Sequence, residues 1–428
     1  MLMSKPYSKR LRVLFVLPPF LPTPPQGYGG IEAVAAALIP ALQRAGARLT
    51  VTTPYGSKLK VSELRTITEP LYKLQSGSYF KLAYGIDLYA AKVLQIARQG
   101  RFDVIHDNSG LLAVTNVLAA ASTEKDFPPV IHTMHNPIPV LADNYLELAK
   151  LPGFNFVAVS KAQLHTAPIV IRQKGRVVYN CVDPQDFQVG PGGDRLLVMG
   201  RFIAEKGQDQ LIRYCAANGI PLDVAGPIAD SDLSSREQIL AEAAKGADSD
   251  YYNNPAFRLF VKTLPYIDGE LIRFHGSVAG EAKEHLLQNA RAMVIPNRWA
   301  EPFGMVALEA MASGTPVLAC GGGAMPELVK HGTTGYVADT FEDLTQYFDP
   351  AWTDQIYRTL CRKHVETNFS ASAAAANTIK LYHELISPVP TPASVVKSLG
   401  LRSLPKPSSE APLDFYEQLP DRRTKQES

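Results

Sequence analysis

The feature that most constrains the fold of this chain is a repeated alternation of short apolar runs with helix-forming stretches. Residues 11–17 form a continuous apolar run, and residues 31–45, after a proline-rich loop, are rich in alanine and end at Gly46. Residues 48–52 then resemble a second strand. Continuous apolar strands separated by helices are typical of a parallel sheet covered on both faces. The beginning of the chain therefore predicts a βαβ unit.

The alternation continues over most of the chain and is interrupted once. Further strands are predicted at residues 103–106, 130–133, 155–159, 176–179, 195–199, 222–225, 271–275, 292–296, 315–319 and 335–337, with helical stretches between them. A segment containing Asp183-Pro184 and Pro191-Gly192-Gly193 has the composition of a linker. Two α/β series on either side of a linker predict two Rossmann-like domains with parallel sheets facing a central cleft.

We place the domain boundaries where the composition changes. The prediction is an N-terminal Rossmann-like domain over residues 1–188, a second such domain over 189–369, a helix over 370–388 and a tail over 389–428. Ser370 is a candidate N-cap for that helix. The tail is dominated by proline, serine and charge without periodicity, so we expect it to be mostly disordered.

Bulk composition excludes several classes of function. The 428 residues have 46% hydrophobic and 20% charged content and a net charge near +2, which is typical of a soluble globular protein with no general attraction to nucleic acid. Four widely spaced cysteines show no metal-binding spacing and indicate reduced thiols. No apolar run is long enough to span a bilayer. We expect a cytoplasmic protein, with peripheral contact at the inner membrane face left open.

Residues 297–323, NRWAEPFGMVALEAMASGTPVLACGGG, predict a loop, a helix and a strand that follow the strand at 292–296. Glu301 and Glu309 are eight positions apart, which is roughly 8–12 Å along a helix. That separation suits the distance from the sugar to the ribose of a nucleotide-sugar. The free amides of the first helical turn offer an anion site between the two carboxylates. The alternative is a pair of solvated surface glutamates.

Glycines and cations follow two other predicted strands. Arg201 and Lys206 lie in GRFIAEKG, at the carboxyl end of a strand, where they would neutralise a pyrophosphate unless the loop is merely solvated. Gly29 and Gly30 precede the first helix and would let a ligand approach the backbone closely. Their spacing is not GxGxxG and no acidic residue ends the second strand, so a nicotinamide enzyme is disfavoured.

Taken together, these motifs resemble the retaining glycosyltransferases of family four, which have the GT-B fold. The resemblance covers about residues 11–386 and rests on an ordered set of motifs: Gly29-Gly30, Thr133-Met134-His135, Val159-Ser160-Lys161, Asn180 to Asp183, GRFIAEKG, EPFGMVALE, SGTPVLA and Pro326-Glu327-Leu328. It implies an α/β protein of two Rossmann-like domains with a C-terminal helix that crosses back to the N-terminal domain. It also implies an enzyme of carbohydrate biosynthesis, a hexosyltransferase.

The resemblance implies a role for each matching position. Arg201 and Lys206 would bind the donor diphosphate, Glu309 the ribose hydroxyls and Glu301 the hydroxyls of the transferred sugar. His135 would lie near the anomeric carbon and the acceptor. The amides of Phe303, Gly304, Met305 and Val306 would approach the sugar and phosphate, and Gly29 and Gly30 would close over the donor. The catalytic set implied is therefore His135, Glu301, Arg201 and Lys206.

The resemblance further implies transfer with retention, from a UDP-, GDP- or ADP-sugar to a sugar, lipid-linked or small-molecule acceptor. It implies no cofactor and no metal, and the chain has no DxD motif placed for a metal-bound diphosphate. Asn108 stands where relatives often have a histidine, which leaves an acceptor contact there open. The alternatives are a glycogen-type synthase, a sugar-nucleotide epimerase, or a non-catalytic module that binds nucleotide-sugar.

Overall fold

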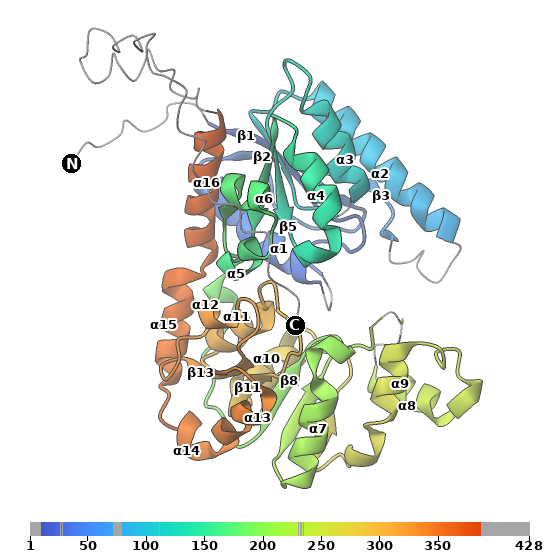
Figure 1. Cartoon of the computed structure of the whole chain (residues 1–428), viewed down its shortest axis with the longest axis vertical. Coiled ribbons are helices and arrows are strands. Elements are labelled where there is room, and N and C mark those ends of the chain that lie inside the picture. Colours follow the sequence, from blue (N-terminus) through green and yellow to red (C-terminus); the bar gives the residue numbers. More distant parts are fainter. Residues whose placement is uncertain are drawn as a thin grey trace, which may run out of the picture. The chain divides into compact units, whose positions relative to one another are not determined.

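A computed structural model of the chain describes residues 10–25, 27, 29–71, 79–110, 112–229, 231, 233 and 235–386 (Figure 1). Two α/β halves, each built on one parallel sheet, make up this part of the chain. The tail predicted over residues 389–428 lies outside the described residues.

The first half contains a seven-stranded sheet of order β3-β2-β1-β4-β5-β6-β7, in which every neighbouring pair is parallel. Its strands are β1 (Arg12–Val16), β2 (Arg48–Pro54), β3 (Glu63–Thr68), β4 (Val104–Asp107), β5 (Val130–Met134), β6 (Phe154–Ala158) and β7 (Arg176–Val177). Its helices are α1 (Gly30–Arg44), α2 (Tyr79–Gln99), α3 (Leu112–Ala121), α4 (Ala142–Ala149), α5 (Lys161–His165) and α6 (Ile169–Lys174), with a 3₁₀ turn η2 (Ile138–Leu141).

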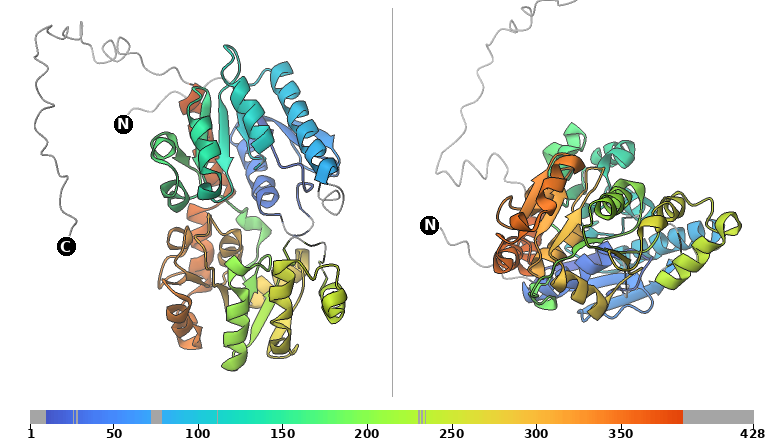
Figure 2. Two further views of the ribbon diagram at one scale, coloured as in Figure 1. Left: turned by 45° about the vertical axis from the view of Figure 1, so that its right-hand side comes forward. Right: turned by 90° about the horizontal axis from the view of Figure 1, so that it is seen from below.

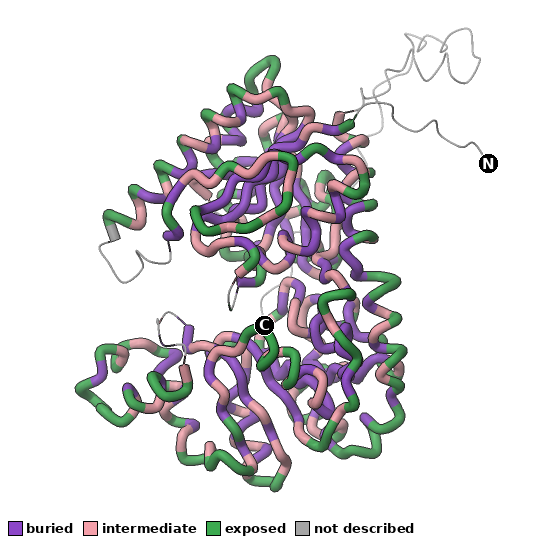
Figure 3. The backbone as a smooth tube through the Cα atoms, turned by 180° about the vertical axis from the view of Figure 1, so that it is seen from behind, coloured by how far each residue is buried: buried purple, intermediate pink, exposed green. Residues whose placement is uncertain are grey.

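Two hydrophobic clusters cover the two faces of this sheet. On β1, Val13 and Phe15 belong to the cluster that includes α1, whereas Leu14 and Val16 belong to the cluster that includes α2 and α3. Successive side chains of a strand point to opposite faces, so a central strand must be apolar at every position. This explains the unbroken apolar run that predicted the strand, and the strands are accordingly the most deeply buried part of the chain (Figure 3).

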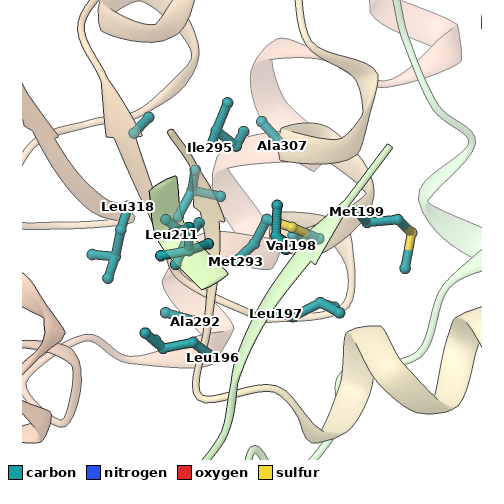
Figure 4. Packing of buried hydrophobic residues seen from close by; sticks show 14 of the residues in the cluster. Leu196, Leu197, Val198, Met199, Leu211, Ala292, Met293, Ile295, Ala307 and Leu318 are labelled. Carbon is teal, nitrogen blue, oxygen red and sulfur yellow. The ribbon is translucent and has the colours of Figure 1, made fainter. Parts of the chain in front are cut away.

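The second half contains a six-stranded parallel sheet of order β10-β9-β8-β11-β12-β13. Its strands are β8 (Leu196–Met199), β9 (Leu222–Ala225), β10 (Ile272–Phe274), β11 (Ala292–Ile295), β12 (Val317–Cys320) and β13 (Gly335–Ala338). Its helices are α7 (Gln208–Ala217), α8 (Arg236–Ala244), α9 (Pro255–Val261), α10 (Gly280–Asn289), α11 (Met305–Ala312), α12 (Met325–Leu328), α13 (Phe341–Leu344), α14 (Pro350–Thr353) and α15 (Arg358–Asn368). Figure 4 shows how Leu196, Val198, Met293 and Leu318 of its strands pack with Leu211 and Ala307 of its helices.

The last described helix, α16 (Ala371–Ile386), packs against α1 of the first half, as expected of a helix that crosses back (Figures 1 and 2). Ser370 precedes it and accepts a hydrogen bond from the Ala373 amide at 3.4 Å. On the inner side of the helix, the Tyr382 hydroxyl lies 2.7 Å from His106 Nδ1 on β4. The fold class is thereby confirmed, whereas the exact domain boundaries stay a prediction.

Sequence patterns misjudged some edge elements. β3 was not predicted, because its sequence ELRTIT is only partly buried at the sheet edge and carries charged residues. The strand expected over residues 176–179 is reduced to Arg176–Val177. Both errors concern edge strands, whose exposed faces tolerate polar residues and weaken the pattern.

Candidate functional site

The strand order places a crevice at the same position in both sheets. β1 is flanked by β2 and β4, and β8 is flanked by β9 and β11, so the direction of winding reverses between β1 and β4 and between β8 and β11. Open α/β sheets bind ligands at the carboxyl ends of the strands on either side of such a reversal. The loops that carry Gly29 and Gly30, Arg201 and Lys206, and Glu301 follow β1, β8 and β11, whereas His135 follows β5, which is next to β4 in the sheet.

In the second half, the loop after β8 is tied to the loop after β11. The Arg298 amide donates to Glu205 O at 2.8 Å, and the Arg298 guanidinium donates to Ala204 O at 2.7 Å. The Gln210 amide group donates to Pro296 O at 2.9 Å. These contacts bring together GRFIAEKG and NRWAEPFG, which are about a hundred residues apart along the chain.

Three donors converge on one oxygen of Glu301. Lys206 Nζ, Asn297 Nδ2 and Trp299 Nε1 lie 2.9, 2.7 and 3.1 Å from Glu301 Oε2. Lys206 Nζ also lies 5.8 Å from the centre of the Trp299 ring, within range of a cation–π contact. Glu301 as a whole is 9% exposed, and burial of a carboxylate to this extent requires such compensation.

The Glu301 backbone is held as firmly as its side chain. Glu301 O accepts from the Ala324 amide at 2.9 Å, and Glu301 is paired with Gly323 in an isolated bridge. Gly323 has a φ of 68°, and a Cβ there would lie 2.1 Å from Glu301 O. The glycine-rich end of β12 is therefore required for the close approach of this loop.

Helix α11 begins beside Glu301. Gly304 is its N-cap with a φ of 98°, and an added Cβ would lie 2.5 Å from Met325 Cε. Met305 and Val306 are the first two helical residues, whose amides have no carbonyl partner within a helix. Glu309 lies about one turn further along, is 6% exposed and accepts from Lys283 Nζ at 2.7 Å.

Arg201 and Phe303 complete the predicted donor side. Arg201 is half-buried and belongs to the same loop as Lys206, whereas Phe303 is buried in the core of the second half. A small cavity of about 10 Å³ is lined here by Lys206, Asn297, Glu301, Gly304 and Val306, among others. That volume holds roughly one water molecule.

In the first half, Gly29 and Gly30 begin α1. A Cβ on Gly29 would lie 2.8 Å from Pro25 Cβ and 3.1 Å from Glu32 Oε2, but a Cβ on Gly30 would meet no atom within 4 Å. The space beside Gly30 is open to a ligand. Glu32 is 5% exposed, and burial raises the pKa of its carboxyl to about 7, opposed by a hydrogen bond from its own amide.

His135 and Asn108 meet at the carboxyl ends of β5 and β4. His135 Nε2 lies 3.2 Å from Asn108 Oδ1, while Asn108 Nδ2 is buried with no hydrogen-bond partner among the described residues. Burial and the neighbouring His132 lower the pKa of His135 to about 3, opposed by Asp107. His135 is thus neutral at pH 7. Because Asn108 Oδ1 can only accept, Nε2 carries the proton and Nδ1 keeps its lone pair.

A buried carboxylate fixes the Asn108 loop. Asp107 Oδ1 accepts from the Ser109 amide at 2.9 Å, and Asp107 Oδ2 lies 2.8 Å from His132 Nδ1 and 2.7 Å from Thr115 Oγ1. Burial would raise the pKa of Asp107, but His132 and Ser109 together hold it below its ordinary value. His132 therefore packs in its strand as a structural partner.

The two halves touch beside the site. Ser160 Oγ donates to Pro302 O at 2.7 Å. Glu327 on α12 accepts from the amides of Lys161 and Ala162 at 3.0 and 2.6 Å and from the Tyr179 hydroxyl at 2.7 Å. Its carboxylate thus occupies the N-terminus of α5 across the boundary between the halves, where a negative charge is favourable.

Sequence reasoning did not identify Asn297, Lys283 or Glu32 as part of this arrangement. It also did not identify the role of Glu327 as a link between the halves. Asn297 is four positions before Glu301 in the same loop, a spacing that offered a signal. Lys283 and Glu327 are far from their partners along the chain, and no local sequence pattern indicates such contacts. Trp299 lies in the same loop and donates from Nε1 to Glu301 Oε2.

A larger hollow lies elsewhere on the described surface. It has a volume of about 550 Å³ and is lined by Arg12, Arg98, Arg101 and Lys125, among others. Arg12 begins β1, so this hollow is at the amino ends of the strands. We assign the site to the opposite edge, because that is where α/β sheets place their ligands.

No group of three or more His, Cys, Asp or Glu side chains is arranged to hold a metal ion in the described part of the chain. Among the described helices, none combines the length and apolarity that a bilayer crossing requires.

Two family models match adjoining parts of the chain. The model described as Glycosyltransferase Family 4 matches residues 28–186, and the model described as Glycosyl transferases group 1 matches residues 183–367. Among relatives, an uncharacterized glycosyltransferase of Methanocaldococcus jannaschii is 30% identical over 166 residues, 38% of this chain and 40% of that protein. The D-inositol 3-phosphate glycosyltransferase of Frankia alni is 25% identical over 328 residues, 68% of this chain and 76% of that protein. The chain spans about two-fifths of the length of the first two curated relatives it matches.

Solved structures share the fold at low sequence identity. Sucrose-phosphate synthase from Thermosynechococcus elongatus has a TM-score of 0.66 and 19% identity, with 88% of this chain and 99% of that chain covered. Anabaena HepE in complex with UDP and glucose has a TM-score of 0.61 and 18% identity, with 87% and 99% covered. At such identities the likeness concerns the GT-B architecture of two Rossmann-like domains.

Proposed function

The chain belongs to family 4 of the glycosyltransferases, and from this premise we propose that it transfers a hexosyl group, with retention of anomeric configuration, from a nucleotide-diphosphate sugar to an acceptor hydroxyl. The observation that carries the proposal is the meeting of Lys206, Glu301 and the first turn of α11 at the crevice between β8 and β11. Cations, an anion-binding helix start and a sugar-binding carboxylate are what such a donor requires.

On the donor side, each group has a separate task. Arg201 and Lys206 neutralise the negative charge that develops on the departing diphosphate, and the amides of Met305 and Val306 donate to its oxygens. Glu309 accepts hydrogen bonds from the ribose hydroxyls. Its carboxylate then binds the ribose and Lys283 at the same time. Because these groups supply positive charge themselves, we propose that the reaction needs no divalent metal and no cofactor.

On the acceptor side, Gly30 leaves space for substrate at the start of α1, and His135 faces the acceptor with a neutral imidazole. A neutral Nδ1 can accept a hydrogen bond from a sugar or acceptor hydroxyl, but His135 is a poor base with a pKa of about 3. The departing phosphate oxygen is then the better acceptor for the proton of the attacking hydroxyl. This favours attack by the acceptor hydroxyl on the same face of the anomeric carbon from which the diphosphate departs.

Glu301 is better described as a hydroxyl ligand than as a nucleophile. Its Oε2 already receives three hydrogen bonds, and each of them lowers the electron density that an attack would use. The second glutamate, Glu309, is paired with Lys283 and belongs to the ribose end. The acceptor classes in question are a sugar, a lipid-linked sugar or a small molecule.

The proposal is tested by screening UDP-glucose, GDP-mannose and ADP-glucose for thermal stabilisation and slow donor hydrolysis, with and without EDTA. UDP-glucose is the first choice, because the solved HepE structures include complexes with UDP and UDP-glucose. We expect one nucleotide-sugar to raise the Tm, with EDTA having no effect. The same ligand should stabilise Arg201→Ala and Glu309→Ala less. If no donor stabilises the protein, or both variants respond as the unaltered protein does, the site assignment fails.

A further inference from the structure

The Glu301 carboxylate is bound unevenly. All three hydrogen bonds that reach it, from Lys206, Asn297 and Trp299, end on Oε2. No hydrogen bond from a described residue reaches Oε1. A buried carboxylate has about four acceptor positions, so an oxygen left without partners has an unused capacity that a ligand hydroxyl can fill.

The three donors differ in how firmly they are held. Asn297 and Trp299 belong to the same short loop as Glu301, and that loop is anchored through Arg298 and Gly323. Lys206 comes from the other loop on a long flexible side chain. Asn297 is 7% exposed, and its only hydrogen bond to a described side chain goes to Glu301. Two donors are therefore fixed, and the third is movable.

We propose that Asn297 and Trp299 are positioning residues that turn Glu301 so that Oε1 receives one hydroxyl of the transferred sugar, while Lys206 is exchanged from Glu301 to the donor diphosphate. The inference rests on the proposed function and names the part of the substrate that the site recognises, which is one hydroxyl of the transferred sugar. It makes Asn297 and Trp299 determinants of sugar binding, although neither needs to touch the sugar.

The charges explain why the exchange occurs. A diphosphate carries more negative charge than one carboxylate and offers several oxygens, so it attracts the Lys206 ammonium more strongly. When the ammonium moves, Glu301 loses one of its three donors. The Asn297 amide and the Trp299 indole keep Oε2 in place during that movement. Without them, the carboxylate would be free to rotate toward Lys206 and Arg201, the two cations that bind the diphosphate.

The chain offers a matched pair of variants for the test. It has two tryptophans, Trp299 and Trp352. Trp352 is 39% exposed on α14 and packs against the rings of Tyr336 and Tyr347, away from the crevice. Trp299→Phe removes the indole donor and keeps an aromatic ring, and Trp352→Phe makes the same chemical change outside the site. Unfolding curves of both variants establish that each is folded.

The measurement is the ratio of two affinities, obtained by calorimetry for UDP and for UDP-glucose, or for the corresponding pair if the screen above selects another nucleotide. Trp299→Phe should lower the preference for the nucleotide-sugar over the nucleotide by roughly tenfold, the loss expected for one hydrogen bond to a charged group. Its affinity for the nucleotide alone should remain unchanged. Trp352→Phe should alter neither value. Asn297→Leu, which removes the second fixed donor without adding a charge, should lose the preference in the same way.

Two results would overturn the inference while leaving the proposed function intact. One is a Trp299→Phe variant that keeps the full sugar preference, and the other is a variant that loses nucleotide and nucleotide-sugar affinity equally. The exchange of Lys206 has its own readout in Trp352→Phe, where Trp299 is the only indole. Nucleotide alone should change its emission as the ammonium leaves the ring, and an unchanged emission would contradict the exchange. Absence of binding by any nucleotide in the unaltered protein is a failure of the proposed function itself.

Discussion

His106 should make the folded protein sensitive to acid in a way that a single substitution can isolate. The imidazole is 4% exposed on β4, with Tyr382 Oη and Thr133 Oγ1 each 2.7 Å from a ring nitrogen. Burial, with smaller contributions from His135 and His132, lowers its pKa to about 3, although Asp107 opposes the shift. The ring therefore stays neutral in the folded protein at every pH used below, whereas in the unfolded chain it titrates near 6.5.

The sign and size of the effect follow from this difference. A folded-state pKa below the unfolded value means that the stability is fully present above pH 6.5 and is lost as the pH falls toward the folded pKa. At pH 4.5 the unfolded ring is protonated and the folded ring is not. The His106 contribution to the free energy of unfolding is then lower by about 2.7 kcal/mol than at pH 8, from two pH units at about 1.36 kcal/mol each.

Other groups also titrate in this range, so the test is a difference between variants. Burial raises the pKa of Glu32 to about 7, which acts in the opposite direction and gains stability as the pH falls. The lowered pKa of Asp107 acts below the ordinary carboxyl range. His135 is only half-buried, so solvent can moderate its contribution. Replacing His106 alone leaves these contributions in both proteins.

The assay is urea unfolding of the unaltered protein and of His106→Gln, followed by circular dichroism at pH 8 and pH 4.5. We expect the substitution to be destabilising at pH 8, with the deficit shrinking by about 2.7 kcal/mol at pH 4.5, because glutamine takes up no proton. The exposed His165→Gln serves as the control and should show no such change. An equal deficit at both pH values would refute the reasoning, since it would mean that His106 is protonated in the folded state.

Two further substitutions test residues that hold the backbone around the site in place. Gly323→Ala should cost about 1–3 kcal/mol of unfolding free energy and weaken nucleotide-sugar binding, because it combines a positive φ with a contact at 2.1 Å from the Glu301 carbonyl oxygen. Gly246→Ala, with a positive φ but no atom within 4 Å, should cost less and leave binding unchanged. Equal costs would contradict the contact argument. Glu327→Gln should lower unfolding free energy by about 1–3 kcal/mol and increase amide hydrogen exchange at Lys161 and Ala162, because the charged acceptor of both amides is lost. Unchanged exchange would show that Glu327 does not hold the start of α5.

The sequence alone determined the features that depend on local pattern. Unbroken apolar runs predicted the central strands, because both faces of β1 and β8 are covered. The helix-forming residues before Gly314 predicted α11, and the eight-residue spacing of Glu301 and Glu309 predicted two carboxylates roughly 8–12 Å apart. The edge strand β3 was not predicted, because apolar, charged and polar residues are mixed in its sequence.

Only the tertiary structure decided which of these parts meet. The order of the strands brings β8 beside β11, so that Lys206 reaches Glu301 across 95 positions of the chain. The same kind of long-range closure joins Tyr179 to Glu327 across 148 positions and His106 to Tyr382 across 276. Such contacts depend on the packing of whole elements rather than on the residues that flank them, so no local spacing encodes them. For the same reason, the sequence indicated that Glu301 binds a hydroxyl, but only the fold showed which of its two oxygens is already occupied.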